Sequence, residues 1–235
     1  MIKFKNITIA LKSPFKAAQY AAAYWSYKSS VAVFTGTPIR EVERLYQEIF
    51  DSQFMKDIAV RSESPVGFSN LTMLAPFRAP TLYVITRILK PKNVAETGVA
   101  NGFSSSFILY AMEKNNLGRL SSIDLPNQPG DVIEKETGWL VPDSLRPRWE
   151  LIIGSSRDKL EPLLERLKSI DIFYHDSEHS YENMKFEFEL AWKYIRPKGY
   201  MLSDDITDNR AFNEFVRNND CKYRDLFKLG IILKN

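Results

Sequence analysis

A short apolar run that ends in a two-glycine turn constrains this chain more than any other feature. The run begins at Asn93 and stops at the acid Glu96, the turn carries Gly98 and Gly102, and a helical pattern follows from Phe103 to Asn116. Glycine allows a ligand to approach the backbone closely, and the first N–H groups of the following helix point at that ligand. A strand, a glycine turn and a helix in this order predict a nucleotide-type cofactor site in an α/β fold.

Glu96, two residues before Gly98, narrows the kind of cofactor. The two glycines are four residues apart, unlike the G-x-G-x-x-G spacing of dinucleotide-binding enzymes. A carboxylate at this position suits a cofactor with a positive charge better than one with a pyrophosphate. S-adenosylmethionine is such a cofactor.

Short apolar segments alternate with helical stretches through most of the remaining chain. Strands are expected at residues 120–124, 150–153, 171–176 and 200–204, with two more candidates in 221–234, and helices at 80–90, 158–167, 181–195 and 211–218. Such alternation predicts a parallel sheet covered by helices on both faces. The sequence Arg196-Pro197-Lys198-Gly199 indicates a helix stop that leads into the fifth strand.

Glu96-x-Gly98-x-x-x-Gly102-Phe103-Ser104 resembles motif I of the class I S-adenosylmethionine-dependent methyltransferases. Its form is that of the catechol-type and macrolide-sugar O-methyltransferases, a metal-dependent group with cephalosporin hydroxylase relatives. The resemblance runs from Pro80 to about Asn218, a little over half of the chain. It implies a Rossmann-like, doubly wound, mostly parallel seven-stranded sheet in residues 80–235, with an edge hairpin at 221–234. An N-terminal helical extension in residues 1–79 would precede this domain.

The resemblance also assigns residues to S-adenosylmethionine. Asp124 ends the second strand, about twenty residues after the glycine turn, where an acid accepts hydrogen bonds from ribose hydroxyls. Taken alone, Asp124 could equally be a helix N-cap or a surface acid. Ser156, in the turn after the third strand, is expected to hydrogen-bond the adenine, to cap the helix that begins near Asp158, or to do both. The predicted cofactor residues are Glu96, Gly98, Gly102, Ser104, Asp124 and Ser156.

Three carboxylates are expected at two neighbouring strand ends. Asp176 ends the fourth strand, and Asp204 and Asp205 end the fifth. Acids that converge repel one another unless a cation lies between them, and oxygen ligands suit Mg²⁺ or another oxygen-preferring divalent ion. The set resembles the metal triad of the catechol-type enzymes, although these usually carry Asn at the third position, so Asp205 adds one negative charge. The alternative is that the acids are separate and cap turns.

His179 lies three residues beyond Asp176, where the catechol-type enzymes have a lysine as general base. An imidazole with a free pKa of about 6.5 suits proton abstraction near neutral pH. We therefore expect His179 to take the proton of the acceptor hydroxyl. His175 is expected to pack in or near the sheet, and Glu178 is either a partner of these groups or a solvated turn acid.

The predicted activity is divalent-metal-dependent O-methylation of a small hydroxylated substrate. A sugar, a catechol and another diol all fit, and the sequence does not rank them. The competing interpretation is a non-methylating relative that binds the same cofactor and metal and serves as a hydroxylase component or partner protein.

The first 79 residues lie outside the resemblance. Residues 17–33 are predicted to be helical, and Thr37 and Pro38 are expected to open a second helix as its N-cap and first residue. The second helix carries a wide apolar face, which either packs internally, covers the cofactor or pairs with another subunit in a homo-oligomer. Residues 125–149 form a long connection with a short helix expected at 131–137. This connection is either a lid or substrate wall, or an inert insertion.

Composition excludes several classes of protein. A net charge of +3 is too weak to indicate nucleic acid without a dense basic cluster. Cys221 is the single cysteine, which rules out an internal disulfide and argues against a Cys/His zinc site. The sequence contains no apolar run of membrane-spanning length and no signal-peptide pattern, so a reduced cytoplasmic location is expected.

Overall fold

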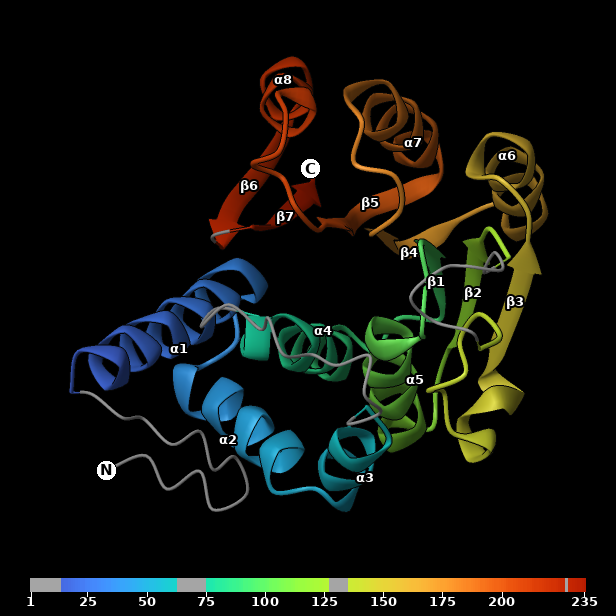
Figure 1. The fold of residues 1–235 in the computed structure, drawn as a ribbon. Helices are drawn as coiled ribbons and strands as arrows, with labels where there is room; N and C mark the ends of the chain where they lie inside the picture. Colours follow the sequence, from blue (N-terminus) through green and yellow to red (C-terminus); the bar gives the residue numbers. More distant parts are fainter. Residues whose placement is uncertain (1–13, 63–74, 127–134, 227) are drawn as a thin grey trace. The chain divides into compact units, whose positions relative to one another are not determined.

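The computed structural model describes residues 14–62, 75–126, 135–226 and 228–235 (Figure 1). Contacts divide the chain into two units, Met1–Leu89 and Lys90–Asn235. The described helices of the first unit are α1 (Pro14–Thr35), α2 (Ile39–Phe50), α3 (Gln53–Ser62) and α4 (Ala75–Leu89). Pro80 lies inside α4, so the domain boundary predicted between residues 79 and 80 falls within this helix, whereas the two units divide after Leu89.

Aromatic side chains form much of the core of the first unit. Tyr24 contacts Tyr46 edge to face, with ring centroids 5.5 Å apart, and Phe77 lies 5.6 Å from Tyr24. The hydroxyl of Tyr46 forms a hydrogen bond of 2.6 Å with that of Thr81 on α4. The apolar face predicted for α2 is buried in this core through Val42, Leu45, Tyr46, Ile49 and Phe50.

The predicted N-cap of α2 is wrong. The helix begins after Pro38, whose carbonyl accepts the N–H groups of Glu41 and Val42. The hydroxyl of Thr37 bonds instead with the hydroxyl of Thr35, 2.9 Å away. A local side-chain bond to the end of the preceding helix has replaced the expected cap.

A seven-stranded sheet forms the centre of the second unit. Its order is β3-β2-β1-β4-β5-β7-β6, with β7 antiparallel to both of its neighbours and the other pairings parallel. This confirms the predicted doubly wound sheet and its edge hairpin. The strands are β1 (Asn93–Thr97), β2 (Arg119–Asp124), β3 (Trp149–Ile153), β4 (Ile170–His175), β5 (Ile195–Ser203), β6 (Cys221–Leu226) and β7 (Leu229–Lys234).

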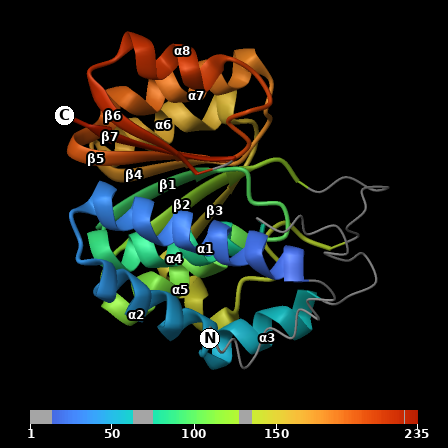
Figure 2. The same ribbon diagram turned by 90° about the vertical axis from the view of Figure 1, so that its left-hand side faces the viewer.

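Helices cover both faces of this sheet. In Figures 1 and 2, α6 (Ser156–Leu167), α7 (Tyr181–Tyr194) and α8 (Ala211–Asn218) lie on one face and α5 (Phe103–Asn115) on the other. Phe173 and Met201 from the sheet pack with Phe188 from α7 and Phe212 from α8 in one buried apolar cluster. The packing fixes the carboxyl ends of the parallel strands, from which the functional turns emerge.

Two local predictions differ from the structure. Residues 196–199 belong to β5, although they were expected to connect a helix to a strand. Ile195 pairs with Ile170, but the next pair is Tyr200 with Ile172, so the intervening residues bulge out of register. A short helix was expected at 131–137. Residues 135–137 are not helical, and residues 131–134 lie outside the described residues. The connection between β2 and β3 contains a 3₁₀ helix instead, η1 (Asp143–Arg148).

Candidate cofactor and catalytic site

A cavity of about 360 Å³ opens at the carboxyl ends of the parallel strands. Four turns form its walls: the glycine turn after β1 and the turns after β2, β3 and β4. Open α/β sheets bind ligands at this edge, where the strand order reverses between β1 and β4. The lining residues that matter most here are Gly98, Asp124, Ser156, Arg157, Asp176 and Glu178.

Gly98 allows the glycine turn to lie directly against the end of β4. Its φ is +85°, and a Cβ added there would stand 2.0 Å from the carbonyl oxygen of Asp176. The N–H of Gly98 donates to the carbonyl of Ile123 on β2, 2.9 Å away. Any side chain at residue 98 would therefore push two cavity walls apart.

Asp124 holds the glycine turn through its side chain. One carboxylate oxygen accepts the N–H groups of Val99 at 2.8 Å and Ala100 at 2.6 Å, and the other accepts the N–H of Leu125. Asp124 also lines the cavity, so it is neither a helix cap nor an isolated surface acid. Ala100 has a φ of +48°, which is uncommon for a residue with a side chain and marks a constrained turn.

Glu96 lies behind the cavity wall. It has no exposed surface, and its carboxylate accepts the hydroxyls of Ser104, Ser105 and Ser122. Burial raises the pKa of Glu96 to about 7, although the three hydroxyl groups act in the opposite direction. Neither Glu96 nor Ser104 lines the described cavity.

Gly102 also lies away from the cavity. It precedes α5 with a φ of +85°, and a Cβ there would lie 2.8 Å from a methyl group of Val141 and 3.0 Å from the backbone of Gly138. The close approach that it permits is to the connection after β2. The predicted cofactor set therefore separates into a lining group, Gly98, Asp124 and Ser156, and a supporting group, Glu96, Gly102 and Ser104.

Ser155, and not Ser156, caps α6. The hydroxyl of Ser155 accepts the N–H of Asp158 at 3.2 Å. Ser156 is the first residue of the helix, and its hydroxyl lies 3.4 Å from the amide oxygen of Asn183 on α7. Ser156 thus stays in the cavity wall and does not cap the helix.

The charges that line the cavity are mainly acidic. Asp124, Asp176 and Glu178 are opposed by Arg157, whose guanidinium carbon lies 4.8 Å from the centroid of the Phe186 ring. The hydroxyls of the β3–α6 turn add polar groups, and Ile123 and Leu125 add apolar surface. This combination suits a ligand that joins a positive centre to a sugar and an apolar ring better than one that carries a pyrophosphate.

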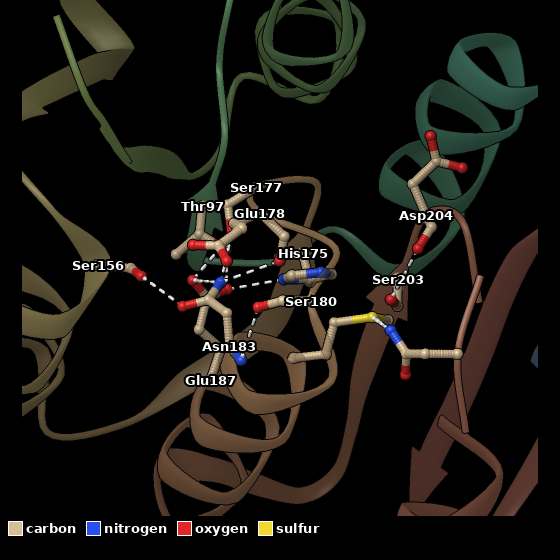
Figure 3. Close-up of polar contacts among 12 residues, drawn as sticks. Thr97, Ser156, His175, Ser177, Glu178, Ser180, Asn183, Glu187, Ser203 and Asp204 are labelled. Carbon is tan, nitrogen blue, oxygen red and sulfur yellow. Dashed lines mark hydrogen bonds and ion pairs between the residues drawn. The ribbon is translucent and has the colours of Figure 1, made fainter. Parts of the chain in front are cut away.

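The backbone brings two of the three predicted metal carboxylates to adjacent positions. His175 on β4 pairs with Ser203 on β5, and the N–H of Asp204 donates to the carbonyl of His175 at 2.9 Å. The side chain of Asp176 accepts the hydroxyl of Tyr174 at 3.0 Å. Asp204 directly follows β5, beside Ser203 in Figure 3, and is buried.

Asp205 has a different partner. Its φ is +47°, and its carboxylate forms an ion pair of 2.9 Å with Lys228. Within the described residues, the structure brings together no set of three acidic, histidine or cysteine side chains that could hold a metal ion. The donor chemistry and the strand-end positions fit Mg²⁺, whereas the side chains are not gathered around one point.

His179 follows β4 in the turn that leads to α7. Its Nε2 atom is buried and has no hydrogen-bond partner among the described residues. Burial lowers the pKa of His179, as does His175, whose ring centroid is 5.3 Å away, while Asp205 and Asp204 act in the opposite direction. The lowered pKa favours the neutral imidazole, which has a lone pair on one nitrogen.

Solved structures of O-methyltransferases share the fold of this chain. The O-methyltransferase from Bacillus cereus in complex with SAH is 16% identical with a TM-score of 0.54, and the match covers 80% of this chain and 94% of that one. The putative caffeoyl-CoA O-methyltransferase from Staphylococcus aureus is 14% identical with a TM-score of 0.58, over 80% and 95% of the two chains. MycE from the mycinamycin pathway, in complex with Mg, SAH and mycinamycin VI, is 14% identical with a TM-score of 0.53, over 78% and 55%. A search of curated proteins found no match.

A family model for a methyltransferase domain matches residues 95–206. The match begins in β1 and ends just beyond β5, so it contains the glycine turn, the cavity and both strand ends. The second unit has the class I methyltransferase fold, and residues 95–206 within it match a methyltransferase domain. None of the helices that the structure describes is long and apolar enough to cross a membrane.

Two polar residues in the segment that matches the methyltransferase domain were not predicted from the sequence. Asn183 lines the cavity, and Glu187, one turn later on α7, is completely buried. Burial raises the pKa of Glu187, but hydrogen bonds, chiefly from His175, outweigh this effect and hold the pKa below its usual value. The sequence did carry a signal for these two residues. Asn183 and Glu187 are four residues apart and therefore lie on the same face of α7, and the other buried residues of this helix are apolar.

Proposed function

We propose that this protein transfers a methyl group from S-adenosylmethionine to a hydroxyl group of a small molecule. The supporting observation is the acidic cavity at the switch point of the sheet, with Gly98 and Asp124 in its wall. Three acids against one arginine favour a cationic cofactor. The fold is shared with O-methyltransferases, of which the one from Bacillus cereus was solved with SAH.

The residues that line the cavity would contact the cofactor. Asp124 keeps acceptor capacity for a ribose hydroxyl, since among the described residues its Oδ1 accepts only the N–H of Leu125 and has a second lone pair, whereas Oδ2 already accepts two N–H groups. Ser156 would contact the adenine, and the backbone of Gly98 would lie beside the amino acid part of the cofactor. Glu96, Gly102 and Ser104 would fix the turn and the start of α5 from behind.

His179 is the proposed general base. Its lowered pKa favours the neutral imidazole, and Nε2 can accept the proton of the acceptor hydroxyl. Asp176, Asp204 and Asp205 would hold a divalent cation, preferably Mg²⁺. S-adenosylmethionine supplies the methyl group on a sulfonium centre, and the cation would lower the pKa of the acceptor hydroxyl.

The acceptor is proposed to be a small hydroxylated molecule such as a sugar, a catechol or another diol. MycE was solved with mycinamycin VI and Mg, and the Staphylococcus aureus protein is described as a putative caffeoyl-CoA O-methyltransferase. These two acceptors differ greatly, so the shared fold does not choose between them.

Calorimetry with S-adenosylmethionine, S-adenosylhomocysteine and NAD tests the cofactor, and transfer of a labelled methyl group to a panel of hydroxylated acceptors tests the activity. We expect heat from the two sulfur compounds and none from NAD. Binding of NAD alone would refute the proposal. Cofactor binding without methyl transfer to any acceptor would favour the non-methylating interpretation.

A further inference from the structure

Glu187 is a buried carboxylate to which the proposed reaction assigns no role. It stands on α7 with no exposed surface and does not line the cavity. Burying a carboxylate is unfavourable unless the charge accepts several hydrogen bonds. The neighbours that donate these bonds therefore indicate why an acid is retained there.

Four side chains donate to Glu187 (Figure 3). One oxygen accepts the hydroxyl of Thr97 at 2.5 Å and Nδ1 of His175 at 2.7 Å. The other accepts the hydroxyl of Ser177 at 2.8 Å and the amide of Asn183 at 3.0 Å. Because a carboxylate only accepts, Nδ1 of His175 carries the hydrogen.

The four donors adjoin the turn after β1, the turn after β4 and the start of α7. Thr97 immediately precedes Gly98, so it ties down the glycine turn. His175 and Ser177 flank Asp176 and fix the turn that leads to His179. The amide nitrogen of Asn183 also donates to the carbonyl of Glu178 at 3.1 Å, and its oxygen faces the hydroxyl of Ser156.

The walls that Glu187 joins are already in direct contact. The N–H of Asp176 donates to the carbonyl of Thr97 at 2.8 Å, and there is no space for a side chain at Gly98. A small shift of Thr97 or Ser177 would therefore change the spacing between the glycine turn and the β4–α7 turn.

We propose that Glu187 is a positioning residue that holds the cofactor turn and the turn carrying Asp176 and His179 at one fixed spacing. It acts through Thr97, His175, Ser177 and Asn183 and touches neither cofactor nor substrate. The inference rests on the proposed function, because it assigns the role of Glu187 to the cofactor cavity.

Glu187→Gln in the full-length chain is the main test. Glutamine has the same size, but its NH₂ group would face donors, so at least one bond of the network is lost. We expect the affinity for S-adenosylhomocysteine, measured by calorimetry, to fall at least tenfold. Amide hydrogen exchange in the 176–180 turn should become faster, and kcat should fall in addition to the rise in KM for S-adenosylmethionine.

Two control variants separate positioning from general loss of stability. Glu189→Gln makes the same substitution two residues further along α7, where the side chain is exposed and pairs with Lys185. Phe212→Leu weakens the apolar core on α8 without touching the polar network. Neither should change cofactor affinity or exchange in the 176–180 turn.

Thr97→Val keeps the test valid if Glu187→Gln does not fold, because it removes one donor at nearly constant volume. It should also weaken binding, and the double variant should bind no more weakly than Glu187→Gln alone, since both act on one network. Wild-type affinity in Glu187→Gln and Thr97→Val, or losses equal to that of Phe212→Leu, would overturn the inference and leave the proposed function intact. Failure of the wild-type chain to bind either sulfur compound would instead refute the proposed function, and this inference with it.

Discussion

Gly98 shows how one missing Cβ positions two segments of the site. Gly98 and Gly36 both have positive φ values, +85° and +66°, but a Cβ at Gly36 would meet nothing within 4 Å, whereas at Gly98 it would overlap the carbonyl of Asp176. We expect Gly36→Ala to lower the free energy of unfolding by about 1 kcal/mol, the cost of the left-handed backbone. Gly98→Ala should lower it by more and should abolish cofactor binding. Urea unfolding and calorimetry measure both, and equal effects of the two substitutions would contradict the close packing.

Glu96 should make the stability of the protein depend on pH. Its pKa is about 7 in the folded protein against 4.5 ordinarily, so its protonated form favours folding. This contribution is present in full below pH 4.5 and is lost as pH rises through 7, a change of about 3 kcal/mol. Glu96→Gln cannot ionise, so relative to wild type it should gain stability between pH 5 and 8. Urea unfolding at several pH values tests this, with the exposed Glu189→Gln as control. If the free energies of unfolding of Glu96→Gln and wild type differed by the same amount at every pH, the burial of Glu96 would not shift its pKa.

The spacing of the glycine turn predicted where Glu96 lies along the chain but not where its side chain points. Adjacent strand residues point to opposite faces of a sheet. Glu96 reaches the serines at the start of α5, and Thr97 reaches Glu187 on α7. Which face carries the cofactor depends on how helices pack on the sheet, and a single sequence does not contain that information.

Among the elements, those with strong periodicity were predicted well. The predicted and observed bounds of α8 agree, and the described strands of the methyltransferase domain lie where short apolar runs stood. The prediction at 196–199 was wrong. Pro197 and Gly199 are typical of a connection between a helix and a strand, but Ile195 already pairs with Ile170, so β5 begins before these residues and includes them. Tertiary pairing outweighed local preference there.

The turn between β4 and α7 carries the prediction for catalysis. His179→Ala should lower kcat roughly 10²–10⁴-fold, the usual contribution of a general base, while the affinity for S-adenosylhomocysteine stays near that of wild type. Burial lowers the pKa of His179, so the wild-type rate should rise with pH along a single titration whose midpoint lies below 6.5. Near-native turnover of the alanine variant, or loss of cofactor affinity, would assign His179 a structural role.

For the whole molecule, methyl transfer and cofactor binding should respond differently to metal removal. Of the proposed metal carboxylates only Asp176 lines the cofactor cavity, whereas Asp204 and Asp205 follow β5, and the conformation described here pairs Asp205 with Lys228, whose side chain is 48% exposed. Chelation should therefore stop methyl transfer and leave the affinity for S-adenosylhomocysteine largely unchanged, and added Mg²⁺ should restore activity. Full activity in excess chelator would exclude a metal requirement.

Replacing Lys228 tests the metal site more directly. Its ammonium group pairs with the carboxylate of Asp205, which is one of the proposed metal ligands. Lys228→Met should lower the Mg²⁺ concentration needed for half-maximal activity by up to about fivefold, since an exposed ion pair contributes up to about 1 kcal/mol. Lys222→Met removes an exposed lysine from β6 with the same change of net charge and should have no such effect. Metal titrations followed by calorimetry would show the shift without reference to turnover. An unchanged titration for Lys228→Met would mean that Asp205 is not a ligand, and Asp176 and Asp204 would then have to bind the ion with other groups.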